Sequence, residues 1–358
     1  MKIFFVVGGL SGSGGVDRVV ANLSDCFAKK GDDVSIYLIN SGFDFPTTAK
    51  IIHYKANYKV RLFRIIEEIV GACKIKKRIT IEKPDIIYNT CWILPIICFF
   101  QRGKIFSAIH NDPSPHMHHM NWKLRFLIRF LKWSNKVIVP VNTLKTTLED
   151  DFGFKNVIVI SNPLDFELID SKKNEAPKDL TDFSSYILAV GRLDKVKGFD
   201  LLINAYSLTR AKEKVHLVII GEGEERNNLQ KLIDEKNLSS RIHLIGARDN
   251  PFAYMKNSLF FVSSSRAETF CLVLAEALAC GVAVISTNIS GPVDFVFHNQ
   301  NGLLVDYNDA VSMANAMDLL CFNEELLLKL KSNARASVEK FNLGSISKKY
   351  EELFCGQR

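Results

Sequence analysis

The 358-residue sequence lacks the marks of exported, membrane-spanning and metal-stabilised proteins. Its eight cysteines are far apart, with no Cys-x-x-Cys pair and no zinc-ligand spacing, so we expect reduced thiols rather than disulfides or a metal centre. The first apolar run, residues 3–7, is too short for a signal peptide. A later run, residues 86–100, contains Asn89 and Pro95 and falls short of the roughly 20 residues of a spanning helix. We therefore expect a cytoplasmic chain without a transmembrane segment.

Long internal repeats and low-complexity segments are absent as well, which argues against a solenoid and against disorder. Hydrophobic residues make up 47% of the chain and the mean hydropathy is near zero, as in proteins with buried cores. A chain of this length is expected to form two domains.

The net charge of +7 is unevenly distributed. Residues 1–165 contain 23 basic and 14 acidic residues, whereas residues 166–358 contain 23 basic and 25 acidic residues. The basic half suggests an anionic partner, which could be a membrane surface, a phosphate-bearing acceptor or nucleic acid. Charge alone does not choose among them.

Short β-branched runs alternate with helical periodicity along the chain, which predicts parallel α/β structure. The expected strands are residues 1–7, 34–39, 85–88, 104–109, 136–139, 157–160, 186–190, 215–220, 242–245, 259–262 and 282–286. Residues 166–185 carry no hydrophobic period and are read as the linker. We predict two Rossmann-like domains, residues 1–165 and 166–340, facing across a ligand cleft, and a C-terminal helix, residues 341–358, that returns to the first domain.

The loop after the first strand is rich in glycine and includes Gly14 and Gly15 before an amphipathic run. Glycines allow backbone N–H groups to approach a phosphate, and a helix N-terminus attracts negative charge. The spacing is neither Gly-x-Gly-x-x-Gly nor a P-loop, so an anion site and a tight turn are equally consistent with it.

A second post-strand loop contains Gly191, Arg192 and Lys197. The guanidinium and ammonium groups could neutralise a departing diphosphate, although two solvated cations at a loop tip are the simpler reading.

A third segment places Glu268 eight positions before Glu276. A strand ending at Val262, a polar loop and a helix capped by Gly281 put Glu268 before the helix and Glu276 within it. N–H groups near residues 270–272 could meet a phosphate or a hydroxyl, and carboxylates accept hydrogen bonds from sugar hydroxyls. A sugar nucleotide offers both partners.

Taken together, these motifs resemble the retaining family 4 glycosyltransferases, which have the GT-B fold. The resemblance covers most of the chain and rests on the glycine-rich N-terminal loop, Gly191-Arg192-Leu193, Lys197-Gly198, Gly221-Glu222-Gly223, Glu268 with Glu276 leading to Gly281, and Gly291-Pro292. It implies a hexosyltransferase that takes a nucleotide diphosphate sugar, with UDP as the expected nucleotide, and a glycan or lipid-linked glycan acceptor. The implied pathway is synthesis of cell-surface polysaccharide such as lipopolysaccharide, O-antigen or capsule.

The resemblance also implies roles for individual residues. Arg192 and Lys197 bind the donor diphosphate, Glu276 contacts the ribose, Glu268 lies beside the donor sugar and His110 is the active-site histidine. The implied donor site comprises Gly14, Gly15, Gly191, Arg192, Lys197, Glu268, Phe270, Cys271, Leu272 and Glu276. The leaving phosphate helps to deprotonate the acceptor, so no metal or other cofactor is expected.

Two departures from the family pattern bear on specificity. Glu268-Thr269-Phe270-Cys271 stands where the family usually has Glu-Gly-Phe-Gly, which bears on the identity of the donor sugar. Asp17 replaces the glutamate that is common before arginine in the N-terminal loop, which bears on the acceptor.

The segment Asn121–Lys136 is basic, aromatic and free of acidic residues, and its pattern predicts a helix. It fits either a helix lying on an anionic membrane or one packed on the first sheet, and the basic residues of 58–78 favour the membrane. His116, His118 and His119 precede it and are read as part of an acceptor-facing loop rather than a metal site. We thus predict peripheral association with the inner face of the plasma membrane.

Two rival functions remain open: a sugar-nucleotide epimerase or hydrolase on the same scaffold, and a protein that binds nucleotide sugars without turnover. Nucleic acid is not expected as a partner, because RNP-like aromatic motifs and zinc spacing are absent.

Overall fold

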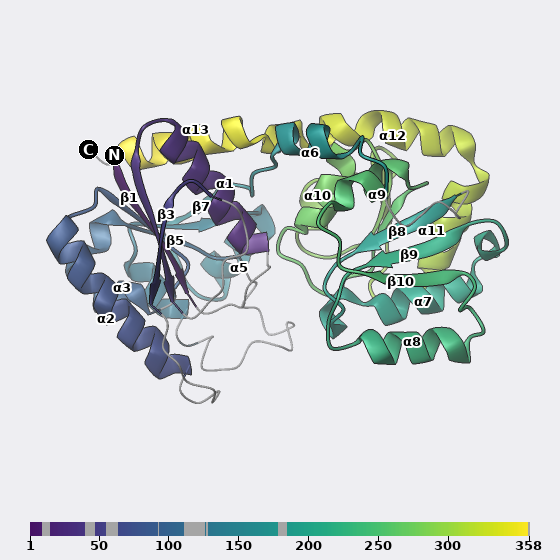
Figure 1. The fold of residues 1–358 in the computed structure, drawn as a ribbon, viewed down its shortest axis with the longest axis horizontal. Helices are drawn as coiled ribbons and strands as arrows, with labels where there is room; N and C mark the ends of the chain where they lie inside the picture. The colour runs from purple at the N-terminus through teal and green to yellow at the C-terminus, as the bar shows by residue number, and fades with distance from the viewer. Residues whose placement is uncertain are drawn as a thin grey trace. The chain divides into compact units, whose positions relative to one another are not determined.

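The computed structural model describes residues 1–8, 15–39, 47–54, 64–91, 93–110, 126, 128–177 and 185–356. The chain forms two compact units (Figure 1). Unit 1 consists of Met1–Pro163 together with Leu343–Arg358, and unit 2 is Leu164–Asn342. None of the helices in these ranges is both long and apolar enough to span a membrane.

Unit 1 is built on a parallel sheet with the strand order β3-β2-β1-β4-β5-β6-β7. Its strands are β1 (Lys2–Gly8), β2 (Asp33–Ile39), β3 (Lys50–Tyr54), β4 (Ile86–Asn89), β5 (Ile105–Ala108), β6 (Lys136–Val139) and β7 (Val157–Val159). The central strand β1 is apolar and buried from Ile3 onward, as expected for a parallel sheet whose two faces are covered.

The helical segments of unit 1 are α1 (Gly15–Lys29), α2 (Arg64–Glu82), α3 (Leu94–Ile97), α5 (Asn142–Asp150) and α13 (Leu343–Cys355), with 3₁₀ turns η2 (Phe99–Lys104) and η3 (Arg129–Trp133). The C-terminal helix α13 lies beside α1 (Figure 1). The Phe354 ring packs 5.7 Å from that of Phe27, and the Tyr350 ring packs 5.8 Å from that of Tyr88. The last residues of the sequence thus complete the core of unit 1.

Unit 2 contains a second parallel sheet with the order β10-β9-β8-β11-β12-β13. Its strands are β8 (Tyr186–Val190), β9 (His216–Ile220), β10 (Ile242–Gly246), β11 (Phe261–Ser263), β12 (Val284–Thr287) and β13 (Gly302–Val305). Its helical segments are α6 (Phe166–Lys172), η4 (Lys195–Lys197), α7 (Phe199–Leu208), η5 (Arg210–Glu213), α8 (Arg226–Glu235), α9 (Pro251–Asn257), α10 (Leu272–Ala279), η6 (Pro292–Asp294), α11 (Ala310–Phe322), α12 (Glu324–Val338) and η7 (Glu339–Phe341).

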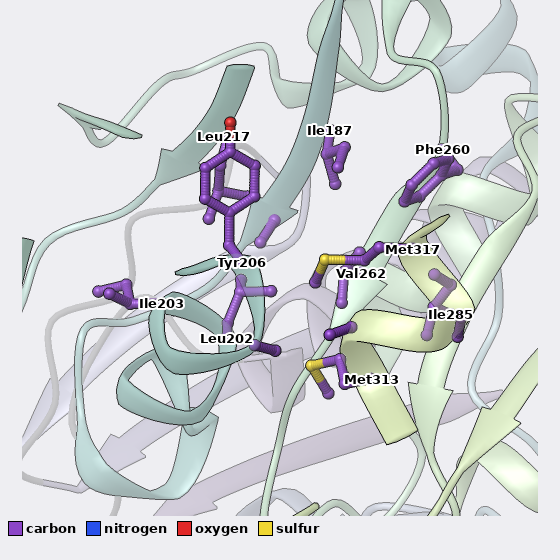
Figure 2. Close-up of a cluster of buried hydrophobic side chains, with 14 of the residues drawn as sticks. Ile187, Leu202, Ile203, Tyr206, Leu217, Phe260, Val262, Ile285, Met313 and Met317 are labelled. Carbon is purple, nitrogen blue, oxygen red and sulfur yellow. The ribbon is translucent and has the colours of Figure 1, made fainter. Parts of the chain in front are cut away.

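The core of unit 2 joins one face of this sheet to α7 and α11. Figure 2 shows Leu202 and Tyr206 of α7 and Met313 and Met317 of α11 among strand residues that include Ile187. Tyr206 is fully buried, and its hydroxyl donates a hydrogen bond to the carbonyl of Val215, so its one polar atom is satisfied.

In each sheet the strand order reverses once, between β1 and β4 in unit 1 and between β8 and β11 in unit 2. Ligands of open parallel sheets bind beyond the carboxyl ends of the strands at such a reversal. The loops after β8 and β11 are therefore the first place to look for a site in unit 2.

The structure corrects several sequence-based expectations. Strands β3 and β13 were not predicted; both are edge strands, and β3 is partly exposed. Part of the predicted linker is the helix α6, which forms because the Asp165 carboxylate accepts a hydrogen bond from the Leu168 N–H, 2.9 Å away, and Phe166 and Ile169 are buried.

The predicted helix over Asn121–Lys136 is confirmed at Phe126 and Ile128, which are α-helical, and is wrong for the residues that follow them. From Arg129 the chain forms the short 3₁₀ turn η3, and Lys136 already begins strand β6. Burial of Ile128 and Leu131 is compatible with one turn, after which the N–H of Asn135 donates to the carbonyl of Ile105, 2.8 Å away. Residues 121–125 and 127 lie outside the described residues.

Candidate active site

The turn after β8 presents two of the predicted cations. The Asp194 carboxylate accepts a hydrogen bond from the N–H of Lys197, at 3.1 Å, and so caps η4. The Arg192 guanidinium, whose side chain is 65% exposed, donates to Asp194 at 2.8 Å. Gly198 ends the turn with φ of 63° and leads into α7. The turn is thus closed locally and leaves Arg192 accessible to a ligand.

The loop after β11 packs directly on this turn. The Ser264 hydroxyl donates to the carbonyl of Lys197, at 2.9 Å, and the N–H of Arg266 donates to the carbonyl of Val196, at 2.7 Å. The Thr287 hydroxyl at the end of β12 donates to the carbonyl of Ser265, at 2.6 Å. Three neighbouring strand ends therefore contribute to one cluster.

Lys197 and Glu268 meet in this cluster as an ion pair between Nζ and Oε1. The Ser265 hydroxyl donates a second hydrogen bond to the same carboxylate oxygen, at 3.0 Å. Burial alone lowers the pKa of Lys197, but the charge of Glu268 and its hydrogen bond outweigh burial and raise it. Lys197 therefore remains a cation at neutral pH.

Two of the predicted donor residues, Phe270 and Cys271, directly precede α10. Cys271 has φ of 62° and ψ of 66°, a left-handed conformation that glycine adopts more readily, and its thiol is buried. Burial raises the pKa of Cys271 to about 12, so the thiol stays protonated. The Phe270 ring packs 5.2 Å from that of Phe341 and is also buried. The side chain of Phe270 is therefore not available to a ligand.

The predicted donor residues of unit 2 fall into two groups. Lys197 and Glu268 are in direct contact, and Arg192 lies on the same turn. Leu272 begins α10 and Glu276 lies within it, with its carboxylate side chain buried. Gly191 directly follows β8, where its N–H donates to the carbonyl of Ile220, at 2.9 Å.

Sequence reasoning missed Asp194, Ser265 and Arg266 as members of this cluster. Asp194 lies between the predicted cations Arg192 and Lys197, and Ser265 lies three residues before the predicted carboxylate Glu268. Their polar side chains at turn positions were the available signal.

The predicted residues of unit 1 are only partly described. Gly15 is the first residue of α1, whereas Gly14 and the histidines of residues 116–119 lie outside the described residues. His110 follows β5, and its Nε2 lies 3.3 Å from the Tyr88 hydroxyl. Burial lowers the pKa of His110 to about 4. His110 is therefore neutral at pH 7, so its imidazole can donate one hydrogen bond and accept another without carrying charge.

The depressed pKa of His110 predicts a loss of stability in acid. Below pH 6.5 an unfolded chain binds a proton at His110 that the folded chain does not bind, so stability falls as the pH drops from about 6.5 toward 4. His110→Gln cannot titrate, and we expect it to lose about 1–2 kcal/mol less unfolding free energy than the wild type between pH 7 and pH 5. Tryptophan fluorescence during urea unfolding reports unit 1 selectively, because all three tryptophans lie in residues 1–163.

The control for this measurement is His53→Gln, which changes an exposed histidine of β3. An identical pH dependence in His110→Gln and the wild type would show that His110 is not held neutral by the fold.

Within the described ranges no group of three or more histidine, cysteine, aspartate or glutamate side chains is arranged to hold a metal ion. Among the predicted donor residues in the described part of unit 2, Arg192 and Lys197 are the groups that could compensate the negative charge of a diphosphate. Independence from metal remains a prediction.

Two family profiles match the sequence. The profile described as Glycosyltransferase Family 4 covers residues 13–168, and that described as Glycosyl transferases group 1 covers residues 170–337. The N-acetylgalactosamine-N,N'-diacetylbacillosaminyl-diphospho-undecaprenol 4-alpha-N-acetylgalactosaminyltransferase of Campylobacter jejuni is 30% identical over 354 residues, 94% of this chain and 95% of that protein. The lipopolysaccharide core biosynthesis glycosyltransferase LpsE of Rhizobium meliloti is 31% identical over 212 residues, 58% of this chain and 60% of that protein.

Solved structures share the fold across the whole chain. Anabaena HepE in complex with UDP and glucose superposes with a TM-score of 0.82 at 19% identity, covering 99% of this chain and 100% of that one. The lipopolysaccharide outer core galactosyltransferase WaaB gives a TM-score of 0.76 at 20% identity and complete coverage of both chains. The chain, with its two parallel-sheet units, therefore belongs to glycosyltransferase family 4 and has the GT-B fold.

Proposed function

We propose that this glycosyltransferase moves a hexosyl group from a UDP-sugar to a glycan or lipid-linked glycan acceptor, with retention at the anomeric carbon, during synthesis of cell-surface polysaccharide. The observation that carries the donor side is the contact between Lys197 and Glu268 beyond β8 and β11. It joins a cation suited to a phosphate and a carboxylate suited to sugar hydroxyls at the strand-order reversal of unit 2.

The proposed chemistry needs charge stabilisation of the leaving diphosphate. The bond between the anomeric carbon and the phosphate oxygen breaks, and the acceptor oxygen bonds to the same face of that carbon. The acceptor proton passes to the leaving phosphate. Lys197 and Arg192 stabilise the negative charge that develops on that phosphate, and Glu268 accepts hydrogen bonds from the sugar. His110 contributes a neutral hydrogen-bonding group.

The named relatives support the choice of substrates. HepE has been crystallised with UDP and glucose, and the Campylobacter relative is named for a sugar transfer onto a diphospho-undecaprenol-linked glycan. LpsE is named for lipopolysaccharide core biosynthesis. A UDP donor and a lipid-linked acceptor are therefore the first substrates to test.

The test is incubation of the protein with a panel of nucleotide sugars, with and without lipid-linked and free glycan acceptors. Acceptor-dependent release of the nucleoside diphosphate, with a product of retained anomeric configuration, supports the proposal. Release of the nucleoside diphosphate at the same rate with and without acceptor indicates a hydrolase, and interconversion of the donor sugar indicates an epimerase. Binding of a nucleotide sugar without any turnover indicates a binding protein.

The proposed lipid-linked acceptor makes an anionic membrane surface a natural partner, and unit 1 carries a surface suited to it. The aromatic side chains Phe99, Phe100, Phe126, Phe130 and Trp133 form a connected row, which we call the aromatic row. The ring centroids of Phe99 and Trp133 are 5.3 Å apart, and Phe100 is 93% exposed. Residues 99–110 and 128–136 contain no acidic residue but include Lys104, Arg129, Lys132 and Lys136. Exposed aromatic rings beside cations favour an interface of anionic lipid.

We expect Phe100→Ser to weaken binding to vesicles containing anionic lipid by about tenfold, because a Phe side chain inserted in lipid contributes about 1.5 kcal/mol or more. Flotation with anionic and with neutral vesicles at low salt measures the effect. Phe322→Ser is the control, since Phe322 is an exposed aromatic residue of unit 2 with the Arg210 guanidinium 5.2 Å from its ring. Equal flotation of both variants would exclude the aromatic row as the lipid-binding surface.

A further inference from the structure

We propose that Arg266 is a positioning residue of the donor site, which holds the loop carrying Glu268 against the turn carrying Lys197. The inference rests on the proposed function for its kinetic consequence. Its structural basis is independent of the substrate, because all of the contacts lie within unit 2.

Arg266 clasps the start of α7 through a two-point ion pair. Its Nη1 lies 2.7 Å from Oδ1 of Asp200, and its Nη2 lies 2.7 Å from Oδ2. Such fork-to-fork pairing fixes orientation as well as distance, which a lysine cannot reproduce. The hydrogen bonds and charge of Arg266 outweigh burial and lower the pKa of Asp200, so the pair stays ionised at neutral pH.

The same loop also satisfies three consecutive carbonyls of the turn. The Lys195 carbonyl accepts from Nη1 of Arg266 at 2.9 Å, the Val196 carbonyl from the Arg266 N–H, and the Lys197 carbonyl from the Ser264 hydroxyl. A 3₁₀ turn of three residues is too short to bond these carbonyls internally. Arg266 supplies two of the three donors, one from its side chain and one from its backbone.

These contacts determine where the ion pair of Lys197 and Glu268 can form. The Lys197 side chain is long, and its Nζ is located by Oε1 of Glu268, two residues after Arg266 in the chain. If the loop moves, the carboxylate and the ammonium move with it. A displacement of about 1 Å at a reacting centre can lower a rate by about 100-fold. Arg266 therefore acts on the reaction through Lys197 and Glu268 without touching the substrate.

Unit 2 offers a closely matched control in Arg335. Its Nη1 and Nη2 bind the two carboxylate oxygens of Asp170 at 2.9 and 2.7 Å, and Nη1 also donates to the carbonyl of Ala279 at 2.9 Å. Arg335 thus has the same two-point pair and the same extra carbonyl as Arg266. Its partners lie in α6 and α10, outside the turn and the loop.

The experiment compares Arg266→Lys with Arg335→Lys in the full chain, using release of nucleoside diphosphate from the donor as the activity. We expect both variants to lower Tm by similar amounts. Arg266→Lys should lower kcat by about tenfold or more with the donor KM changed less than about threefold, while Arg335→Lys keeps kcat within about twofold. Asp200→Asn should match Arg266→Lys, and the double variant should be no worse than either single variant.

Hydrogen exchange supplies a readout that does not depend on activity. Faster exchange in residues 195–198 and 264–268 of Arg266→Lys, and not of Arg335→Lys, supports the positioning role. Unchanged exchange there, or equal kcat in the two variants, overturns it. A wild type that turns over no nucleotide sugar refutes the proposed function instead, and the exchange comparison then still decides whether Arg266 holds the loop.

Discussion

Lys197→Ala is expected to lower turnover of the donor by roughly 100- to 1000-fold while unit 2 remains folded. Removing one well-placed charge from a site of this kind costs about 3–4 kcal/mol of transition-state stabilisation. Lys197 is suited to that role because its ammonium is mostly shielded from solvent, with the side chain 23% exposed, and is held by Glu268. Glu268→Ala is expected to give a comparable loss, since it releases Lys197 and removes the carboxylate.

The measurement is steady-state release of nucleoside diphosphate, with circular dichroism to show that the variants are folded. Lys195→Ala is the matched control, because it removes an exposed cation two residues away and leaves the Lys195 carbonyl that Arg266 uses. We expect it to change turnover less than about threefold, as exposed surface charges contribute little. Near-normal turnover by Lys197→Ala would show that Lys197 does not contribute to the donor site.

Gly198→Ala is expected to destabilise unit 2 and to abolish most of the activity. Gly198 has φ of 63°, and a Cβ atom built on it would lie 2.2 Å from the carbonyl oxygen of Ser264. The left-handed conformation costs an alanine about 1–2 kcal/mol, and relief of the overlap adds about 1–3 kcal/mol. Since the overlap is with the loop that carries Glu268, relaxation separates the loop from the turn.

Gly281→Ala separates the cost of the left-handed backbone conformation from the cost of the steric overlap. Gly281 has φ of 79°, and no atom lies within 4 Å of a Cβ built there. It should therefore show only the conformational cost and retain activity. Denaturant unfolding followed by circular dichroism gives both free energies, and equal losses in the two variants would contradict a tight contact between turn and loop.

Much of the fold could be predicted because it depends on local pattern. The run Tyr186–Val190 was predicted as a strand and is β8, and Lys136–Val139 was predicted as a strand and is β6. Buried parallel strands are continuous apolar runs, which are visible in any window of a few residues. The helix before Gly281 was equally visible from its apolar length and its glycine cap.

The predictions that failed depended on which face of a segment meets the rest of its unit. The aromatic and basic run is predicted as a helix up to Lys136, but after the helical residues Phe126 and Ile128 it turns, and Ser134 and Asn135 bond to β5. Phe270 is a predicted donor-site residue, and the structure adds that its ring is enclosed by Phe295 and Phe341. Neither partner is near in sequence, so no local pattern contains the information.

By itself, the sequence determined the α/β class, most strands and the motifs that carry the family resemblance, because apolar runs, glycines and charges at strand ends are local properties of the chain. Only the tertiary structure decided that Lys197 bonds Glu268, that Cys271 adopts a left-handed conformation, and that Arg266 clasps Asp200. The two ion pairs join residues 71 and 66 positions apart in the sequence. They form because the parallel order of β8 and β11 brings two distant loops to the same edge of one sheet.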